Sequence, residues 1–271
     1  MSITATAARP RVYRLSARGV LAGEWTKFGS LRSTWITLGV SVLLLVAIGA
    51  IAAASFGPGG SGRGPGGGQA EDAVSLALAG STFAALAVGV LGVLFSAGEY
   101  TTGMIRSTLT AVPTRLPVLW AKGLIAGGVA LVLMTAGALV SFVLGSPLLQ
   151  TGVTALGLGD DGVLRSLAGA GVYLGLVAVF GVALGALVRS SAGGIAILAG
   201  TLLILPGLVS LLPDSWSSTI SPYLPSTAGE AALTLHPGTG SLSPGAGLAV
   251  FAGYVALVLV AAAYRLKKTD A

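Results

Sequence analysis

Six long runs of apolar residues divide the chain, and polar residues gather between them. The runs are Thr34–Phe56, Val74–Ala97, Gly123–Gly145, Ser166–Val188, Gly193–Leu212 and Gly247–Tyr264. Each is close to the roughly 20 residues that a helix needs to cross the hydrocarbon core of a bilayer. None contains Asp, Glu, Lys, Arg or His. The pattern predicts an all-α, polytopic membrane protein with six transmembrane helices at residues 34–264, a cytosolic segment at 1–33 and a cytosolic tail at 265–271.

The composition supports a membrane protein. Apolar residues make up 54% of the 271 positions, charged residues only 9%, and the mean hydropathy is +0.91. A soluble domain carries about 25% charged residues, so this chain has too few to cover itself with a wettable surface. Inside a bilayer every backbone polar group must be paired within the protein, which favours helices for the spans. The chain has no Cys, so disulfides and thiolate metal sites are excluded.

The basic residues predict the orientation of the bundle. If the N-terminus is cytosolic, thirteen of the fifteen Lys and Arg residues lie in cytosolic segments, and only Arg63 and Arg165 lie outside. Short cytosolic segments of membrane proteins carry such an excess of Lys and Arg. We therefore expect both termini in the cytosol. The net charge of +6 reflects this topology, and no nucleic-acid partner is expected.

The available side chains argue against catalysis by this chain. The only His, His236, precedes Pro237 in a predicted outer loop, and adjacent Asp160 and Asp161 fit an outer turn. No G-x-x-x-x-G-K-[ST] segment is present, so the chain has no P-loop for ATP. We identify no catalytic residue, no metal ligand and no cofactor site. Ion-coupled transporters place ionisable residues within their spans, so any transport here would draw energy from another subunit.

Two weaker patterns concern packing and the last outer loop. Three G-x-x-x-G pairs, Gly123/Gly127, Gly171/Gly175 and Gly181/Gly185, are as many as chance gives with 42 glycines. They therefore predict no particular helix contact. In the outer loop Pro213–Ala246, Thr227 and Glu230 fit a capping box, which predicts a short helix over Ala228–Leu235.

A helix lying in the membrane interface is predicted before the first span, over Ser16–Ser33. Leu21, Trp25 and Phe28 are spaced i, i+4, i+7 and form one apolar face. A Trp at headgroup depth, with basic residues nearby, is typical of an interfacial helix. Three glycines weaken this helix by up to about 1 kcal/mol each. A plain polar leader with an aromatic anchor is the alternative interpretation.

A second cytosolic helix, Glu99–Val112, is predicted between the second and third spans. Its apolar face would hold Met104, Ile105, Thr108, Leu109 and Val112. Glu99, Arg106 and Thr110 would share the polar face, and Pro113 would end the helix. A short, charged, amphipathic helix between two membrane helices is typical of an element on which a partner docks. A solvated loop helix is the alternative.

Five segments, in order along the chain, resemble permeases of the ABC type-two exporter family, particularly those of actinobacteria. They are Glu24–Lys27 (EWTK), Leu31–Trp35 (LRSTW), Gly98–Arg106 (GEYTTGMIR), Leu187–Ala192 (LVRSSA) and Tyr223–Gly229 (YLPSTAG). Met104 stands where many relatives have Thr. The resemblance implies a homo- or heterodimer of six-span permeases in a bacterial plasma (inner) membrane, each docked on a separate nucleotide-binding ATPase subunit that holds the ATP. It also implies that Ser16–Ser33 is the connecting helix and Glu99–Val112 the coupling helix.

The sequence therefore predicts a permease that exports a hydrophobic or amphipathic compound, such as a drug, an antibiotic or a lipid-like molecule. ATP would be hydrolysed on the partner chain. Glu99, Arg106 and Thr110 would contact that ATPase subunit, and Leu21, Trp25 and Phe28 would seat the interfacial helix in the bilayer. A membrane accessory or immunity protein without transport activity is the alternative, and a passive channel is the third hypothesis.

Overall fold

The computed structural model describes residues 16–55, 72–112, 115–149, 153–238 and 240–268, and within α5 it leaves the side chains of Arg106, Leu109 and Ala111 undescribed. The described chain is all-α, as predicted, and 84% of the described residues are helical. Its first half contains α1 (Ala17–Ser30), α2 (Arg32–Ser55), α3 (Ala73–Ala77), α4 (Ser81–Thr101), α5 (Met104–Ala111), α6 (Leu116–Gly145) and the 3-10 turn η1 (Ser146–Leu148). The second half contains α7 (Val163–Val188), α8 (Ser191–Ala199), the π-helical turn η2 (Gly200–Ile204), α9 (Leu205–Val209), α10 (Asp214–Ile220), η3 (Ser221–Tyr223), α11 (Pro225–Glu230), η4 (Ala231–Leu233) and α12 (Pro244–Lys268).

Six helical segments of the described chain are long and apolar enough to cross a membrane, and each overlaps one predicted run. They are α2, α3 with α4, α6, α7, α8 through α9, and α12. Large apolar side chains on their outer surfaces remain exposed, including Leu43, Leu124 and Val260 at 62%, 65% and 68%. A soluble protein rarely leaves so much contiguous apolar surface in water. The bundle is therefore a multi-pass membrane protein whose outer surface contacts lipid.

Five of the six described spans extend beyond the uncharged runs predicted for them and include charged residues. Helix α4 continues to Thr101 and so includes Glu99, and α6 begins at Leu116 and so includes Lys122. The ends of α2, α7 and α12 also carry charged residues, namely Arg32, Arg165, Arg265, Lys267 and Lys268, which are exposed. The expectation that no transmembrane helix carries an ionisable residue is therefore wrong, and only in α4 and α6 are the added charges buried. The physical reason is that Glu99 and Lys122 pair with opposite charges, so the helices can continue through them.

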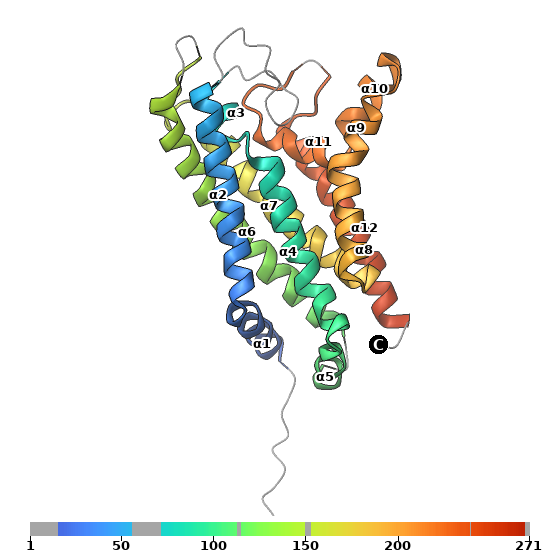
Figure 1. Ribbon diagram of the computed structural model, residues 1–271. Coiled ribbons are helices and arrows are strands. Elements are labelled where there is room, and N and C mark those ends of the chain that lie inside the picture. The colour runs from blue at the N-terminus through green and yellow to red at the C-terminus, as the bar shows by residue number, and fades with distance from the viewer. Residues whose placement is uncertain (1–15, 56–71, 113–114, 150–152, 239, 269–271) are drawn as a thin grey trace, which may run out of the picture.

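Helix α7 lies at the centre of the bundle and packs against α4, α6 and α12 (Figure 1). Glycines on α7 permit the close approach. A Cβ atom at Gly185 would lie 2.6 Å from the carbonyl oxygen of Val93 on α4, and one at Gly175 would lie 3.0 Å from that of Gly127 on α6. At Gly181 it would collide with the carbonyl oxygen of Gly89. These glycines, which carried no signal as sequence motifs, lie in close helix contacts.

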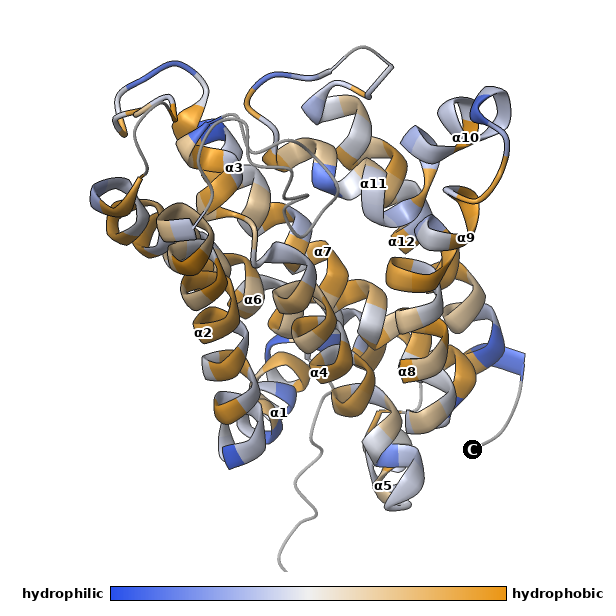
Figure 2. Ribbon diagram, turned by 45° about the horizontal axis from the view of Figure 1, so that its top comes forward, coloured by the Kyte–Doolittle hydropathy of each residue, from blue (hydrophilic) through white to orange (hydrophobic). Residues whose placement is uncertain are grey.

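The two ends of the bundle differ in charge. Helices α1 and α5 and the end of α12 lie at one end, and α3, α10 and α11 lie at the other (Figure 1). Hydrophobic residues fill the middle of the bundle, and hydrophilic residues gather toward its ends (Figure 2). The described basic residues of the α1 and α5 end are Arg18, Lys27, Arg32, Arg115, Lys122, Arg189, Arg265, Lys267 and Lys268. Arg9, Arg11, Arg14 and Arg63, which also entered the topology prediction, lie outside the described residues.

The last loop between spans folds back onto the bundle. Its helix α11 begins at Pro225, before the predicted start at Ala228, because Pro fits the first turn of a helix. The predicted capping box is wrong: Glu230 instead accepts a hydrogen bond from the hydroxyl of Thr82 on α4, at 3.2 Å. Burial raises the pKa of Glu230 to about 7, and the Thr82 hydrogen bond opposes that rise. The contact fixes the loop against the N-terminal end of α4.

Candidate functional site

Helix α1 forms where the sequence predicts it and lies across the N-terminal end of α2 (Figure 1). Its N-cap is Ser16, whose hydroxyl accepts a hydrogen bond from the backbone N–H of Gly19 at 3.1 Å. At the other end Leu31 adopts an extended conformation, which separates α1 from α2. This break allows α1 to leave the direction of the span.

The three residues of the predicted apolar face of α1 do not share one environment. Leu21 and Trp25 are exposed. Phe28 is fully buried and packs edge-to-face on Phe95 of α4, with 5.0 Å between ring centroids. The face of α1 that meets the bundle includes Phe28 and Glu24, so it is rotated from the face that the periodicity indicated.

A buried group of four charged residues, here called the ion cluster, joins three helices. It consists of Glu24 and Lys27 on α1, Glu99 on α4 and Lys122 on α6. The Nζ of Lys27 lies 2.6 Å from Oε1 of Glu24 and 2.9 Å from Oε1 of Glu99. The Nζ of Lys122 lies 2.8 Å from Oε2 of Glu24 and 2.9 Å from Oε1 of Glu99. Every member therefore contacts both residues of opposite charge.

The ion cluster is electrically balanced, which explains how it can be buried. Glu24, Glu99 and Lys122 are each about 3% exposed, and an unpaired charge there would cost several kcal/mol. Lys122 gains two further partners, the carbonyl oxygen of Phe95 at 3.3 Å and the face of the Phe95 ring at 4.1 Å. Partial burial lowers the pKa of Lys27, but hydrogen bonds and attraction from Glu24 and Glu99 outweigh it, so the pKa is raised overall.

Helix α5 is also tied to the ion cluster. The Nζ of Lys27 donates a hydrogen bond to the hydroxyl oxygen of Thr108 at 3.0 Å. Ile105, Thr108 and Val112 are buried, as predicted for the apolar face, whereas Met104 is 44% exposed and departs from that prediction. One face of α5 therefore packs on the protein, and the other is open to the surroundings.

The structure separates the three residues predicted to contact an ATPase. Glu99 lies in the last turns of α4, buried in the ion cluster, so its predicted place on the exposed face of the short helix is wrong. The cause is Gly103, whose φ of 71° ends one helix and begins the next. Thr110 is exposed on α5, where its hydroxyl donates to the carbonyl oxygen of Ser107 at 3.3 Å. Arg106 lies in α5, but its side chain lies outside the described residues.

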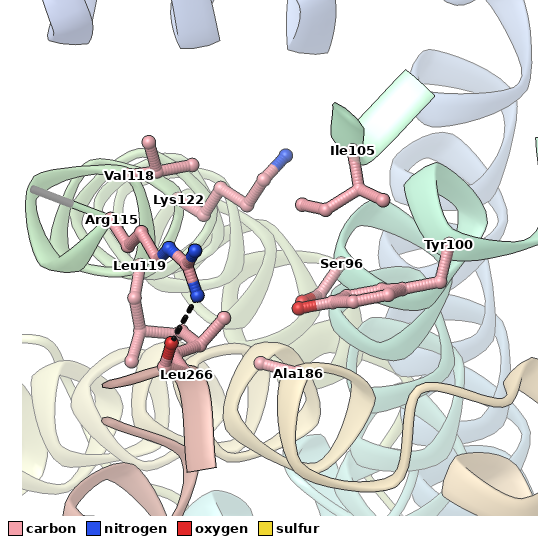
Figure 3. Close-up of a pocket in the computed structure, with 9 residues that line it drawn as sticks. All are labelled: Ser96, Tyr100, Ile105, Arg115, Val118, Leu119, Lys122, Ala186 and Leu266. Atoms are coloured by element: carbon pink, nitrogen blue, oxygen red, sulfur yellow. Dashed lines mark hydrogen bonds between the residues drawn. The ribbon is translucent and has the colours of Figure 1, made fainter. Parts of the chain in front are cut away.

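A small pocket of about 20 Å³ lies beside the ion cluster, between the adjacent ends of α4, α5, α6, α7 and α12 (Figure 3). Its lining residues are Ser96, Tyr100, Ile105, Arg115, Val118, Leu119, Lys122, Ala186 and Leu266. Arg115 precedes α6 and donates from Nη1 to the carbonyl oxygen of Leu266 on α12, at 3.2 Å. Arg189 lies over the ring of Tyr100, with 5.2 Å from its guanidinium carbon to the ring centroid.

Sequence reasoning missed Glu24, Lys27 and Lys122 as parts of one site. Glu24 and Lys27 are spaced i, i+3 on the predicted interfacial helix, and Glu99 and Lys122 each stand beside an apolar run. That placement is the signal that could have suggested pairing at the membrane edge. The described residues include no group of three or more His, Cys, Asp or Glu side chains that could hold a metal ion.

Comparison with known proteins adds no assignment. No protein-family model matches the chain, and no curated protein matches it significantly. The functional argument therefore rests on the bundle, α1, α5, the ion cluster and the segments that resemble exporter permeases.

Proposed function

We propose that this chain is the membrane-spanning permease subunit of an ATP-driven exporter of the ABC type-two kind. The observation that carries the proposal is the ion cluster, which ties two helices outside the spans, α1 and α5, to the transmembrane helices α4 and α6. The exported compound is hydrophobic or amphipathic, and ATP is bound and hydrolysed on a separate nucleotide-binding subunit. The basic end of the bundle faces the cytosol of a bacterium, where that subunit docks.

The contacts of α5 support its assignment as the coupling helix in this proposal. Its exposed face, with Met104, Ser107 and Thr110, is available to a cytosolic partner, and its buried face rests on the bundle. A displacement of α5 acts on Lys27 through Thr108, and Lys27 in turn holds Glu99. Movement of a docked ATPase would therefore reach α1 and α4 through short, direct contacts.

The energy source follows from the charges. Glu99 and Lys122 are the buried ionisable residues that the described structure adds to the predicted apolar runs, and each is held in ion pairs. A carboxylate engaged by two lysines is poorly suited to carry protons or sodium ions across the bundle. The chain also lacks a P-loop, so ATP must act through a partner. A second permease, identical or related, completes the assembly in this proposal.

Tryptophan at Thr110 is expected to disrupt docking while leaving the bundle intact. The bulky side chain would stand on the exposed face of α5, so the amount of P-loop ATPase that copurifies with the full chain should fall about tenfold, equivalent to about 1.4 kcal/mol. The measurement is affinity purification in mild detergent from the native host, followed by quantification of the ATPase and its ATP hydrolysis.

The matched control is Thr219→Trp, on exposed α10 at the opposite end of the bundle, which should leave copurification unchanged. A wild-type chain that brings down no ATPase would favour the accessory or immunity protein. Equal ATPase recovery with Thr110→Trp and wild type would show that α5 is not the docking helix.

A further inference from the structure

The segment formed by α11 and η4, residues 225–233, packs as part of the bundle. A Cβ atom at Gly169 on α7 would collide with the carbonyl oxygen of Ala232. One at Gly247 on α12 would collide with the carbonyl oxygen of Ala228. Both alanines are almost fully buried. The segment therefore lies in backbone contact with two spans, at the end of the bundle opposite the ion cluster (Figure 1).

Glu230 is the only charged residue of this segment. The hydroxyl of Thr82 on α4 donates a hydrogen bond to Oε1 of Glu230 at 3.2 Å. One helical turn before Glu230, on the same side of α11, the Ser226 side chain is 5% exposed, and its hydroxyl has no hydrogen-bond partner among the described residues. An unpartnered buried hydroxyl is rare in a folded protein, and this one is spaced to bond the carboxyl group of Glu230.

The groups around Glu230 supply no compensating positive charge. Helix α7 presents the ring of Tyr173, which lies against Gly229. Its Arg165 donates to two backbone carbonyl oxygens of the loop at 3.0 Å and forms no ion pair with Glu230 within the described chain. On α12, the hydroxyl of Tyr254 donates to a backbone carbonyl oxygen of η3 at 3.2 Å. The first turns of α4, and η2, carry no charged residue.

The protonation state of Glu230 therefore affects how the segment docks. Burial raises the pKa of Glu230 from an ordinary 4.5 to about 7, and the Thr82 hydrogen bond opposes that rise. Since the docked state holds the proton more tightly than an exposed carboxyl group does, docking is strongest below pH 4.5 and weakens as the pH rises through about 7. Part of the Glu230 side chain stays accessible, so protons from the adjoining aqueous phase can reach it.

We propose that Glu230 is a proton-binding site that controls how firmly α11 and η4 dock on α4, α7 and α12. The neutral carboxyl group accepts a hydrogen bond from Thr82 and donates one to the hydroxyl oxygen of Ser226. Loss of the proton leaves a carboxylate with no positive charge beside it, which favours release of the segment toward water. The site depends only on the packing of α11, so it stands or falls independently of the transport function.

The test uses the full chain in nanodiscs of zwitterionic lipid, with two readouts. Infrared spectroscopy follows the protonated carboxyl group of Glu230, identified by its loss in Glu230→Gln. Because the chain has no Cys, a nitroxide attached through Thr234→Cys, at an exposed position just after η4, reports by electron paramagnetic resonance whether the segment is immobilised or mobile. The ratio of mobile to immobilised label should rise about tenfold from about pH 5 to about pH 8.5. In Glu230→Gln the ratio should stay low and constant, whereas His236→Gln, which removes an exposed titratable group of the same loop, should behave as wild type.

Two further variants separate the contacts of the carboxyl group. Thr82→Val removes a hydrogen bond that favours the carboxylate, so the midpoint of the infrared titration should move to higher pH. Ser226→Ala removes the acceptor for the protonated form, so the midpoint should move to lower pH, by about half a pH unit or more.

Three results would overturn the proposal. They are a wild-type midpoint near pH 4.5, a label ratio equal in wild type and Glu230→Gln at every pH, or unchanged midpoints in both Thr82→Val and Ser226→Ala.

Discussion

Replacement of Lys122 by methionine is expected to lower the free energy of unfolding by about 3–5 kcal/mol. Lys122 is buried and contacts both Glu24 and Glu99, so its loss leaves two buried carboxylates facing Lys27 alone. Methionine fills a similar volume, which separates the effect of charge from that of a cavity. The measurement is unfolding of the detergent-solubilised chain by titration with sodium dodecyl sulfate, followed by helical circular dichroism.

A charge-balanced double variant tests the cause of this loss. Lys122→Met combined with Glu99→Gln leaves one carboxylate and one ammonium, so it should be more stable than Lys122→Met alone. Lys268→Met, at the exposed end of α12, should change stability by less than about 0.5 kcal/mol. If Lys122→Met and Lys268→Met are equally stable, the ion cluster does not hold the helices together.

Alanine at Gly181 is expected to destabilise the bundle by about 1–3 kcal/mol or more. The added methyl group would collide with the carbonyl oxygen of Gly89 on α4. A backbone atom cannot rotate away as a side chain can, so α4 and α7 would have to separate along their contact. The same unfolding titration measures the change, with the yield of monodisperse protein as a second readout.

Gly128 on α6 provides the matched control, because a Cβ atom built there meets nothing within 4 Å. Gly128→Ala should be neutral or stabilising by up to about 1 kcal/mol, since Ala favours helix more than Gly does. Equal stability of the Gly181 and Gly128 variants would contradict the close packing of α4 on α7.

The six spans could be predicted from sequence because a transmembrane helix is a local property. An apolar run of sufficient length must form a helix in a bilayer, whatever it packs against. The helix α1 was predictable for a related reason, the spacing of its aromatic residues before the first span. The buried side of α1 was not predictable, because Phe28 is buried through its packing on Phe95 of α4, a contact that the local sequence does not specify.

The position of Glu99 illustrates what the sequence could not supply. Reading Glu99–Val112 as one helix placed Glu99 in phase with Arg106 and Thr110. The break at Gly103 ends α4, so Glu99 follows the phase of α4 and points into the protein. A glycine just beyond a helix end is a recognised stop signal, and greater weight on Gly103 would have separated the two helices.

The ion cluster and the tight glycines depend on how helices are rotated against one another. Lys27 and Glu99 are 72 residues apart in sequence, and nothing in their local patterns specifies their contact. In the same way, Gly181 must lack a side chain because the carbonyl oxygen of Gly89 on a neighbouring helix lies against it. Counting motifs along one segment could not reveal this contact.

Site-specific photocrosslinking tests the proposed docking of an ATPase at α5 most directly. A benzophenone amino acid would be placed at Thr110 of the full chain, in intact cells of the native host, and crosslinked partners would be identified by mass spectrometry. The same probe at Asp214, at the start of α10, reports on the opposite end of the bundle. The account predicts that a P-loop ATPase crosslinks to position 110 and not to position 214. An ATPase crosslinked from position 214, or none from position 110 in the folded chain, would contradict it.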